Sequence, residues 1–224
     1  MPAEPAGGWT QGDGSLPDRL TLADWRRRVA ELYAEVRAMA ASDPGIALAH
    51  WRAAREWLFR EHPQSPVPAG ARAAFRAAHF DHDPSLRFEV MVEPSPPPAP
   101  GAPPIELPNS GEDVIAFSRV GTVRIPFPDG ERPLSVFWMR GYAGGLFLPF
   151  RDATNGTETY GAGRYLLDAA KSADLGTAPD TGALILDFNF AFQPSCAFDP
   201  KWACPLAPPE NRLDVAIRAG ERLA

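Results

Sequence analysis

The side chains best suited to ligand binding gather in one stretch of the chain, residues 150–165. The candidate site residues in this stretch are Arg151, Asp152, Thr154, Tyr160 and Arg164. Arginine donates paired hydrogen bonds to carboxylates and phosphates, so Arg151 and Arg164 are predicted to hold an anionic ligand. The alternative is an internal ion pair of Arg151 with Asp152 or Asp187 that stiffens a loop.

A second candidate group lies in residues 183–190, where apolar side chains alternate as they do along a β-strand. Alternation places Asp187 and Asn189 together on the face opposite the core. If that face lines a cavity, Asp187 is a general acid or base, or a hydrogen-bond anchor, and Asn189 orients the ligand. If it faces solvent, the two side chains are simply hydrated.

Two cysteines, Cys196 and Cys204, stand eight residues apart. This spacing matches neither a zinc ribbon nor a CxxC redox motif. Three interpretations stay open: buried structural thiols, a reversible redox pair, or a nucleophilic thiol.

All four histidines precede residue 83. His79 and His82 have a spacing that metal ligands use, but nothing else in the sequence completes a ligand set, and a solvated polar turn is the favoured interpretation. Phosphate-loop, dinucleotide-binding, GxSxG and HExxH motifs are all missing from the sequence. No motif therefore indicates a metal or another cofactor.

The amino-acid composition limits which classes of partner the protein is expected to bind. The 224 residues are 45% hydrophobic and carry a net charge of −6, because 28 acidic residues outnumber 22 basic ones. An acidic balance argues against nucleic acid as the main partner. No apolar run approaches the roughly 20 residues that span a bilayer, and the N-terminus lacks the features of a signal peptide. We expect a soluble cytoplasmic protein with no membrane partner, and no oligomeric state is predicted.

The N-terminal third has helical periodicity. Residues 1–19 predict a loose tail, and residues 20–85 a helical segment. Within that segment, apolar side chains recur at steps of three and four from Leu22 to Met39, a second helix is expected over residues 46–61, and a short third over residues 69–78.

From residue 86 the periodicity changes to that of strands, so residues 86–224 are predicted to form a β domain. Its proline-rich segment, 94–108, indicates a spacer or a surface loop. Asp129-Gly130 is typical of a hairpin turn. Beyond a strand from residue 86 to 93, the predicted strands are 113–117, 122–126, 134–140, 146–151, 163–167, 183–190 and 212–218. The predicted class is α+β, with N-terminal helices packed on a mainly antiparallel β-barrel or sandwich.

Several motifs also resemble those of a known family. They are residues 150–154, 159–166, 186–189, 194–197, 204–213 and 217–221. In order and spacing these motifs resemble the bacterial family DUF1684, a domain of unknown function, over about residues 145–222. Phe192, Gln193 and Phe198 depart from the Tyr, Asn and Tyr expected there, which argues against a proton relay through these positions.

The resemblance implies that one polar set belongs together, although it implies no reaction. That set is Arg151, Asp152, Thr154, Tyr160, Arg164, Asp187, Asn189, Glu210 and Asn211. The leading hypothesis is a small polar or anionic molecule bound in a β-domain pocket, with Asp187 or Glu210 as a possible acid or base. One alternative is a non-catalytic protein in which the set forms an internal network. The other is a thiol redox role for Cys196 and Cys204.

Overall fold

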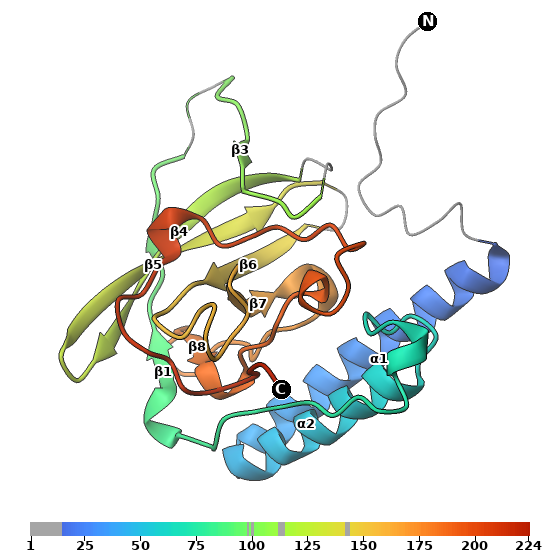
Figure 1. Ribbon diagram of the computed structural model, residues 1–224. Helices are drawn as coiled ribbons and strands as arrows, with labels where there is room; N and C mark the ends of the chain where they lie inside the picture. The colour runs from blue at the N-terminus through green and yellow to red at the C-terminus, as the bar shows by residue number, and fades with distance from the viewer. Residues whose placement is uncertain (1–14, 98, 100, 112–114, 142–143) are drawn as a thin grey trace, which may run out of the picture.

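The computed structural model describes residues 15–97, 99, 101–111, 115–141 and 144–224. Two long helices form an antiparallel hairpin beside a twisted antiparallel sheet, and the C-terminal segment runs between the two (Figure 1). The fold is therefore α+β, as predicted.

The helical hairpin consists of α1, Leu16–Ala40, and α2, Pro44–Glu61. Both begin at a capping side chain: Ser15 accepts from the Asp18 amide, and Asp43 accepts from the amides of Gly45 and Ile46. Helix α1 thus starts inside the tail predicted for residues 1–19, of which residues 1–14 lie outside the described part of the chain. The third helix predicted for 69–78 is wrong; only one 3-10 turn, η1 at Ala69–Ala71, forms there.

The main sheet has six strands in the order β2-β4-β5-β6-β7, with β3 paired to β4. The strands are β2 Glu93–Pro94, β3 Ile105–Glu106, β4 Ala116–Phe127, β5 Gly130–Met139, β6 Gly145–Phe150 and β7 Arg164–Asp168. A separate antiparallel pair joins β1, Arg87–Val90, to β8, Leu184–Asp187. Within the described residues the six-stranded order does not return to its start, so the sheet is open and the barrel prediction is not supported.

Several predicted strand bounds change. The strands expected at 113–117 and 122–126 are one strand, β4, whose register shifts between Arg119 and Gly121; residues 113 and 114 are outside the described chain. A Cβ on Gly121 would lie 2.5 Å from the Glu93 carbonyl oxygen, so this crossing needs glycine. The segment predicted as a strand at 212–218 is irregular. The ends of the proline-rich segment supply β2 and β3, and the hairpin at Asp129-Gly130 is confirmed.

The two faces of the sheet bury different partners. One face packs against the β1–β8 pair, with Val123, Leu134 and Leu148 meeting Leu186 and Phe188. The other face packs against the helices. There Phe117, Phe137 and Phe147 of the sheet share a core with Leu32, Val36, Leu48 and Trp51. Burial of these large side chains is what holds the helical hairpin on the sheet.

Candidate functional site

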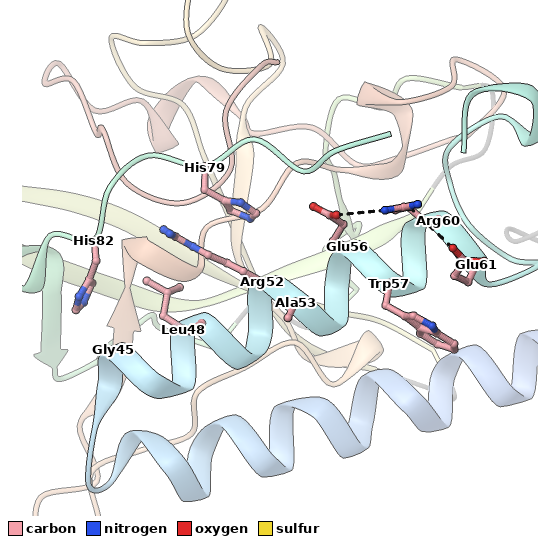
Figure 2. A pocket seen from close by; sticks show the side chains of 11 residues that line it. Gly45, Leu48, Arg52, Ala53, Glu56, Trp57, Arg60, Glu61, His79 and His82 are labelled. Carbon is pink, nitrogen blue, oxygen red and sulfur yellow. Dashed lines mark ion pairs between the residues drawn. The ribbon is translucent and has the colours of Figure 1, made fainter. Parts of the chain in front are cut away.

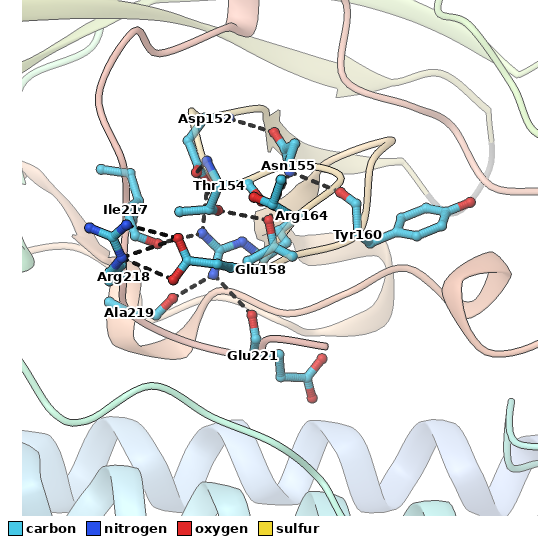
Figure 3. Close-up of polar contacts among 12 residues, drawn as sticks. Asp152, Thr154, Asn155, Glu158, Tyr160, Arg164, Ile217, Arg218, Ala219 and Glu221 are labelled. Carbon is cyan, nitrogen blue, oxygen red and sulfur yellow. Dashed lines mark hydrogen bonds and ion pairs between the residues drawn. The ribbon is translucent and has the colours of Figure 1, made fainter. Parts of the chain in front are cut away.

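Arg164 on β7 is completely buried, and both of its terminal nitrogens donate hydrogen bonds to other groups of the protein. Nη2 donates to Asp152 Oδ2 at 2.7 Å and to the Ile217 carbonyl at 2.8 Å, and Nη1 donates to the carbonyls of Ala219 and Glu221 (Figure 3). Burial lowers the pKa of Arg164, while the charge of Asp152 raises it. Its terminal nitrogens have no donor left for a bound anion.

Asp152, the partner of Arg164, also organises the turn that follows it. Its Oδ1 accepts from the amide of Thr154 at 2.7 Å and from the Thr154 hydroxyl, and that hydroxyl contacts the hydroxyl of Thr159 at 2.8 Å. Asn155 donates to the Tyr160 carbonyl (Figure 3). The structure therefore brings Asp152, Thr154 and Arg164 together, but in an internal network in which only Arg164 Nε has no hydrogen-bond partner among the described residues.

The carbonyls bound by Arg164 belong to the C-terminal segment, residues 217–222, which in turn holds a second segment, residues 78–83. The amide of Phe80 donates to the Gly220 carbonyl at 3.0 Å, and the amide of Arg222 donates to the Ala78 carbonyl at 3.0 Å. Gly220 has a φ of +75°, and a Cβ there would overlap the Ala191 carbonyl.

Asn189 fixes the same second segment from the other side. Its Oδ1 accepts from the Asp83 amide at 2.9 Å and its Nδ2 donates to the Asp83 carbonyl at 2.7 Å. Strand β8 ends at Asp187 and the 3-10 turn η4, Phe188–Phe190, follows, so the predicted alternation does not continue to Asn189. Asp187 caps η4 by accepting from the Asn189 amide at 2.9 Å.

The Asp187 carboxylate is buried, and its Oδ2 has no hydrogen-bond partner among the described residues. Arg87 Nη1 lies 3.6 Å away. Burial raises the pKa of Asp187, and the hydrogen bonds from Asn189 lower it, as does the charge of Arg87 to a lesser extent.

The remaining predicted residues lie elsewhere. Glu210 is exposed and pairs with Arg119 at 2.8 Å. Asn211 is buried and joins strands β5 and β6, because it binds both backbone groups of Ser135 and the Pro149 carbonyl. Half-buried Arg151 forms a backbone bridge with Arg212.

An open groove of about 690 Å³ runs along α2, on the side that faces residues 79–82 (Figure 2). Small side chains of α2, Ala49 and Ala53, leave the space, and Trp57, 47% exposed, stands beside them. The remaining lining residues are Gly45, Leu48, Arg52, Glu56, Arg60, Glu61, His79 and His82.

Three nitrogen atoms of residues that line this groove are buried and have no hydrogen-bond partner among the described residues: Arg52 Nε, Arg60 Nε and His79 Nε2. Arg52 is positioned by Nη2, which donates to the Phe80 carbonyl at 2.8 Å, and it forms no ion pair with a described carboxylate. Arg60, by contrast, has Glu56 at 3.8 Å and Glu61 at 3.9 Å (Figure 2). Arg52 is thus the cation of the groove that is open to a further partner.

His79 is neutral at physiological pH. Burial lowers the pKa of His79 to about 4; the charge of Glu221 opposes this, and the charges of Arg52 and Arg55 reinforce it. Its ring packs edge-on against Trp51, with centroids 5.8 Å apart. The other ring nitrogen hydrogen-bonds the Ala77 backbone, which leaves Nε2 as an acceptor without a partner among the described residues.

Sequence reasoning missed Arg52 and did not place His79 at a ligand site. Ala49 and Ala53 on the outer face of α2 were the available signal, since small residues one turn apart leave room beside a helix.

Among the described residues there is no group of three or more potential metal-ligating His, Cys, Asp or Glu side chains. No helix in the described part of the chain has the length and apolar character to cross a bilayer.

An α+β protein with a helix-lined groove and an interior polar network is the class that this geometry defines. The model of the family described as "Protein of unknown function (DUF1684)" matches residues 74–222, and the chain belongs to that family. It is similar to an uncharacterised protein of Haloarcula marismortui whose solution NMR structure has been solved. The two share 32% identity and a TM-score of 0.58, over 82% of this chain and 96% of that one. No curated protein matches the sequence.

Proposed function

We propose that this protein binds a small organic anion in the groove along α2, with the anionic group at Arg52 and His79. The observation that carries the proposal is that Arg52 and His79 both line this groove, and that Arg52 Nε and His79 Nε2 are buried without a hydrogen-bond partner among the described residues. Arg60 Nε is also without a hydrogen bond, but Arg60 has two carboxylates within ion-pair distance and Arg52 has none among the described residues. A buried polar atom without a partner costs about 1–3 kcal/mol, so a ligand that supplies both partners recovers that free energy.

The two atoms ask for different partners. Arg52 Nε is a donor and calls for an oxyanion, whereas Nε2 of neutral His79 accepts a hydrogen bond from a hydroxyl group. An oxyanion with a neighbouring hydroxyl meets both demands, as in a singly protonated phosphate ester or a hydroxycarboxylate. The apolar floor of Leu48, Ala53 and Trp57 favours an apolar body on the ligand.

The polar set around Arg164 has a different role in this proposal. We assign it to the internal network, one of the alternatives drawn from the sequence, because Arg164 directs its terminal nitrogens to Asp152 and to three backbone carbonyls. The network holds the C-terminal segment, which holds residues 78–83 and thereby the His79 wall of the groove. Asn189 supports the same wall through Asp83.

The proposal is one of binding, and it assigns no reaction. Glu210 pairs with Arg119 at the surface, and Asp187 is not among the residues that line the groove. Both carboxylates therefore have roles outside ligand contact, Asp187 as the cap of η4 that positions Asn189.

The experiment is a titration with phenyl phosphate, followed by isothermal calorimetry and by amide chemical shifts of α2 and residues 77–83. Inorganic phosphate tests the anionic group alone, and benzyl alcohol the apolar body alone. We expect phenyl phosphate to bind tightest. Arg52→Gln should weaken binding by about tenfold or more, which is the loss of one charge-assisted contact.

Arg60→Gln is the matched control, because it removes the same charge from the same groove but from an arginine that already has carboxylate partners. We expect its affinity to stay within about twofold of the unmodified protein. Equal losses for Arg52→Gln and Arg60→Gln, or no shift changes in the groove with any probe, would overturn the proposal.

A further inference from the structure

Cys196 and Cys204 meet below the surface of a loop. Their residues are 7% and 5% exposed, both thiols are free, and the Cys196 amide donates to Cys204 Sγ at 3.4 Å. The side chains also hydrogen-bond each other. Only one turn, η5 at Ser195–Ala197, and the partly exposed residues 198–203 separate them along the chain. Two thiols in hydrogen-bond contact are close enough to approach each other for disulfide formation.

Hydroxyl groups surround this thiol pair. Ser110 Oγ accepts from the Cys204 amide at 2.8 Å and donates to the Trp202 carbonyl at 3.0 Å, so it holds the second cysteine in place. The Tyr160 hydroxyl hydrogen-bonds the Cys196 thiol. Burial, together with Cys196, raises the pKa of Tyr160 to about 12, so this hydroxyl keeps its proton and can donate it.

The two thiols are not equivalent. A hydrogen bond from the Cys204 thiol, with a smaller contribution from the Tyr160 hydroxyl, lowers the pKa of Cys196 despite its burial. The same bond, followed by burial, raises the pKa of Cys204. Cys196 is therefore the thiol that ionises first, and the thiolate is the nucleophilic form.

We propose that Cys196 and Cys204 form a reversible disulfide, with Cys196 as the thiol that reacts with a small hydroperoxide and Cys204 as the thiol that resolves it. The contact of the two sulfur atoms, the Tyr160 hydroxyl at Cys196 and the anchoring of Cys204 by Ser110 carry the proposal.

The oxidant is a hydroperoxide, of which hydrogen peroxide is the simplest. The Cys196 thiolate attacks one peroxide oxygen, the O–O bond breaks, and the departing hydroxide takes a proton to become water. Cys196 is then a sulfenic acid. Cys204 sulfur next attacks Cys196 sulfur, the S–S bond forms, the S–O bond breaks, and the hydroxide leaves with the Cys204 proton as water. The two thiols lose two electrons, the peroxide gains them, and a dithiol reductant reverses the change.

The site is separate from the groove along α2, since it shares no lining residue with it. The inference therefore does not rest on the proposed binding function. Arg52→Gln, which tests that function, should oxidise at the same rate as the unmodified protein.

The test begins with fully reduced protein treated with hydrogen peroxide, then denatured and alkylated with N-ethylmaleimide. We expect the intact mass to fall by about 2 Da with no alkylation, and dithiothreitol to restore two alkylated thiols. Retention of two alkylatable thiols with an unchanged mass identifies structural thiols and overturns the proposal. Oxidation by about 32 Da without disulfide formation overturns the resolving role of Cys204.

Two serine variants assign the roles. Cys204→Ser should react with hydrogen peroxide and stop at a sulfenic acid on Cys196, which dimedone traps. Cys196→Ser should react with hydrogen peroxide at least about tenfold more slowly. Equal rates for both variants contradict the assignment. Tyr160→Phe removes the hydroxyl at Cys196 and should slow the reaction, while the melting temperature of each variant checks that the fold is intact.

Discussion

Arg55 of α2 and Glu221 of the C-terminal segment form a buried ion pair across 166 residues of chain. Arg55 Nη2 lies 3.2 Å from Glu221 Oε2, a second contact joins Nε to Oε1, and the side chains are 14% and 3% exposed. The guanidinium also packs over the rings of Phe59 and Phe192, 4.4 and 4.9 Å from their centroids. Because Glu221 Oε2 accepts from the Gln193 amide at 2.7 Å as well, this pair ties the helical hairpin to the β domain.

Replacing Glu221 with Gln should lower the free energy of unfolding by about 3–5 kcal/mol, because it leaves the Arg55 charge buried without a counter-charge. Urea unfolding measures the change. Glu158→Gln is the control, since it breaks the exposed pair with Arg218 and should change the urea midpoint far less. Equal effects from both variants would show that the Arg55–Glu221 pair adds nothing beyond a surface contact.

Arg164→Met should be at least as damaging, since it strands Asp152 and removes partners from the carbonyls of Ile217, Ala219 and Glu221. We expect a loss of about 3–5 kcal/mol in the free energy of unfolding, together with faster amide exchange in residues 217–222. A variant that loses ligand affinity but unfolds at the original urea concentration would restore the ligand-holding role predicted from the sequence.

Acid should destabilise the protein through His79. Its pKa is about 4 in the folded state and ordinarily about 6.5, so the unfolded chain binds the extra proton between these values. The contribution of neutral His79 is complete above about pH 6.5 and is lost as the pH falls, by at most about 1.4 kcal/mol per pH unit. Urea midpoints between about pH 7.5 and pH 4.5 should fall less steeply in His79→Asn. His50→Asn, on the surface beside Glu35, is the control.

Asp187 should act in the opposite direction. Burial raises its folded pKa above the unfolded one, so its stabilising contribution is complete at low pH and is lost as the pH rises through that raised value. Asp187→Asn keeps an acceptor for the Asn189 amide and removes the titration. The stability of this variant relative to the original should therefore increase from about pH 4 to pH 7. A pH-independent difference would mean that Asp187 titrates alike in both states.

The sequence pattern predicted those elements that are determined by residues close together in the chain. The first helix followed from the apolar stripe between Leu22 and Met39, and the hairpin from Asp129-Gly130. The end of β8 at Asp187 could not be read this way, because Asn189 leaves the strand to bind Asp83, 106 residues away along the chain. An open sheet and a barrel also share the same strand pattern, since closure depends on which strands are neighbours.

In the candidate site, too, contacts between residues close in sequence could be predicted, and contacts between distant segments could not. Asp152, Thr154 and Arg164 lie close in sequence and are together in the structure. Whether an arginine meets a ligand or a carbonyl depends on segments far away, here residues 217–221, so the sequence left both interpretations open. Arg52 and His79 come together because the C-terminal segment and Asn189, both distant in sequence, hold residues 78–83 beside α2.

Both margins of the six-stranded sheet are covered in part, which bears on how the protein behaves at high concentration. On one side, the two-residue strands β2 and β3 pair with the outer edge of β4, and Pro94 of β2 has no backbone N–H that could donate to a further strand. On the other, Tyr165 of β7 exchanges backbone hydrogen bonds of 2.9 and 3.1 Å with Phe192. An uncovered margin is a template for strands of neighbouring molecules, and short or proline-bearing edge strands suppress such pairing. These short pairings therefore leave less of each margin open to strands of neighbouring molecules.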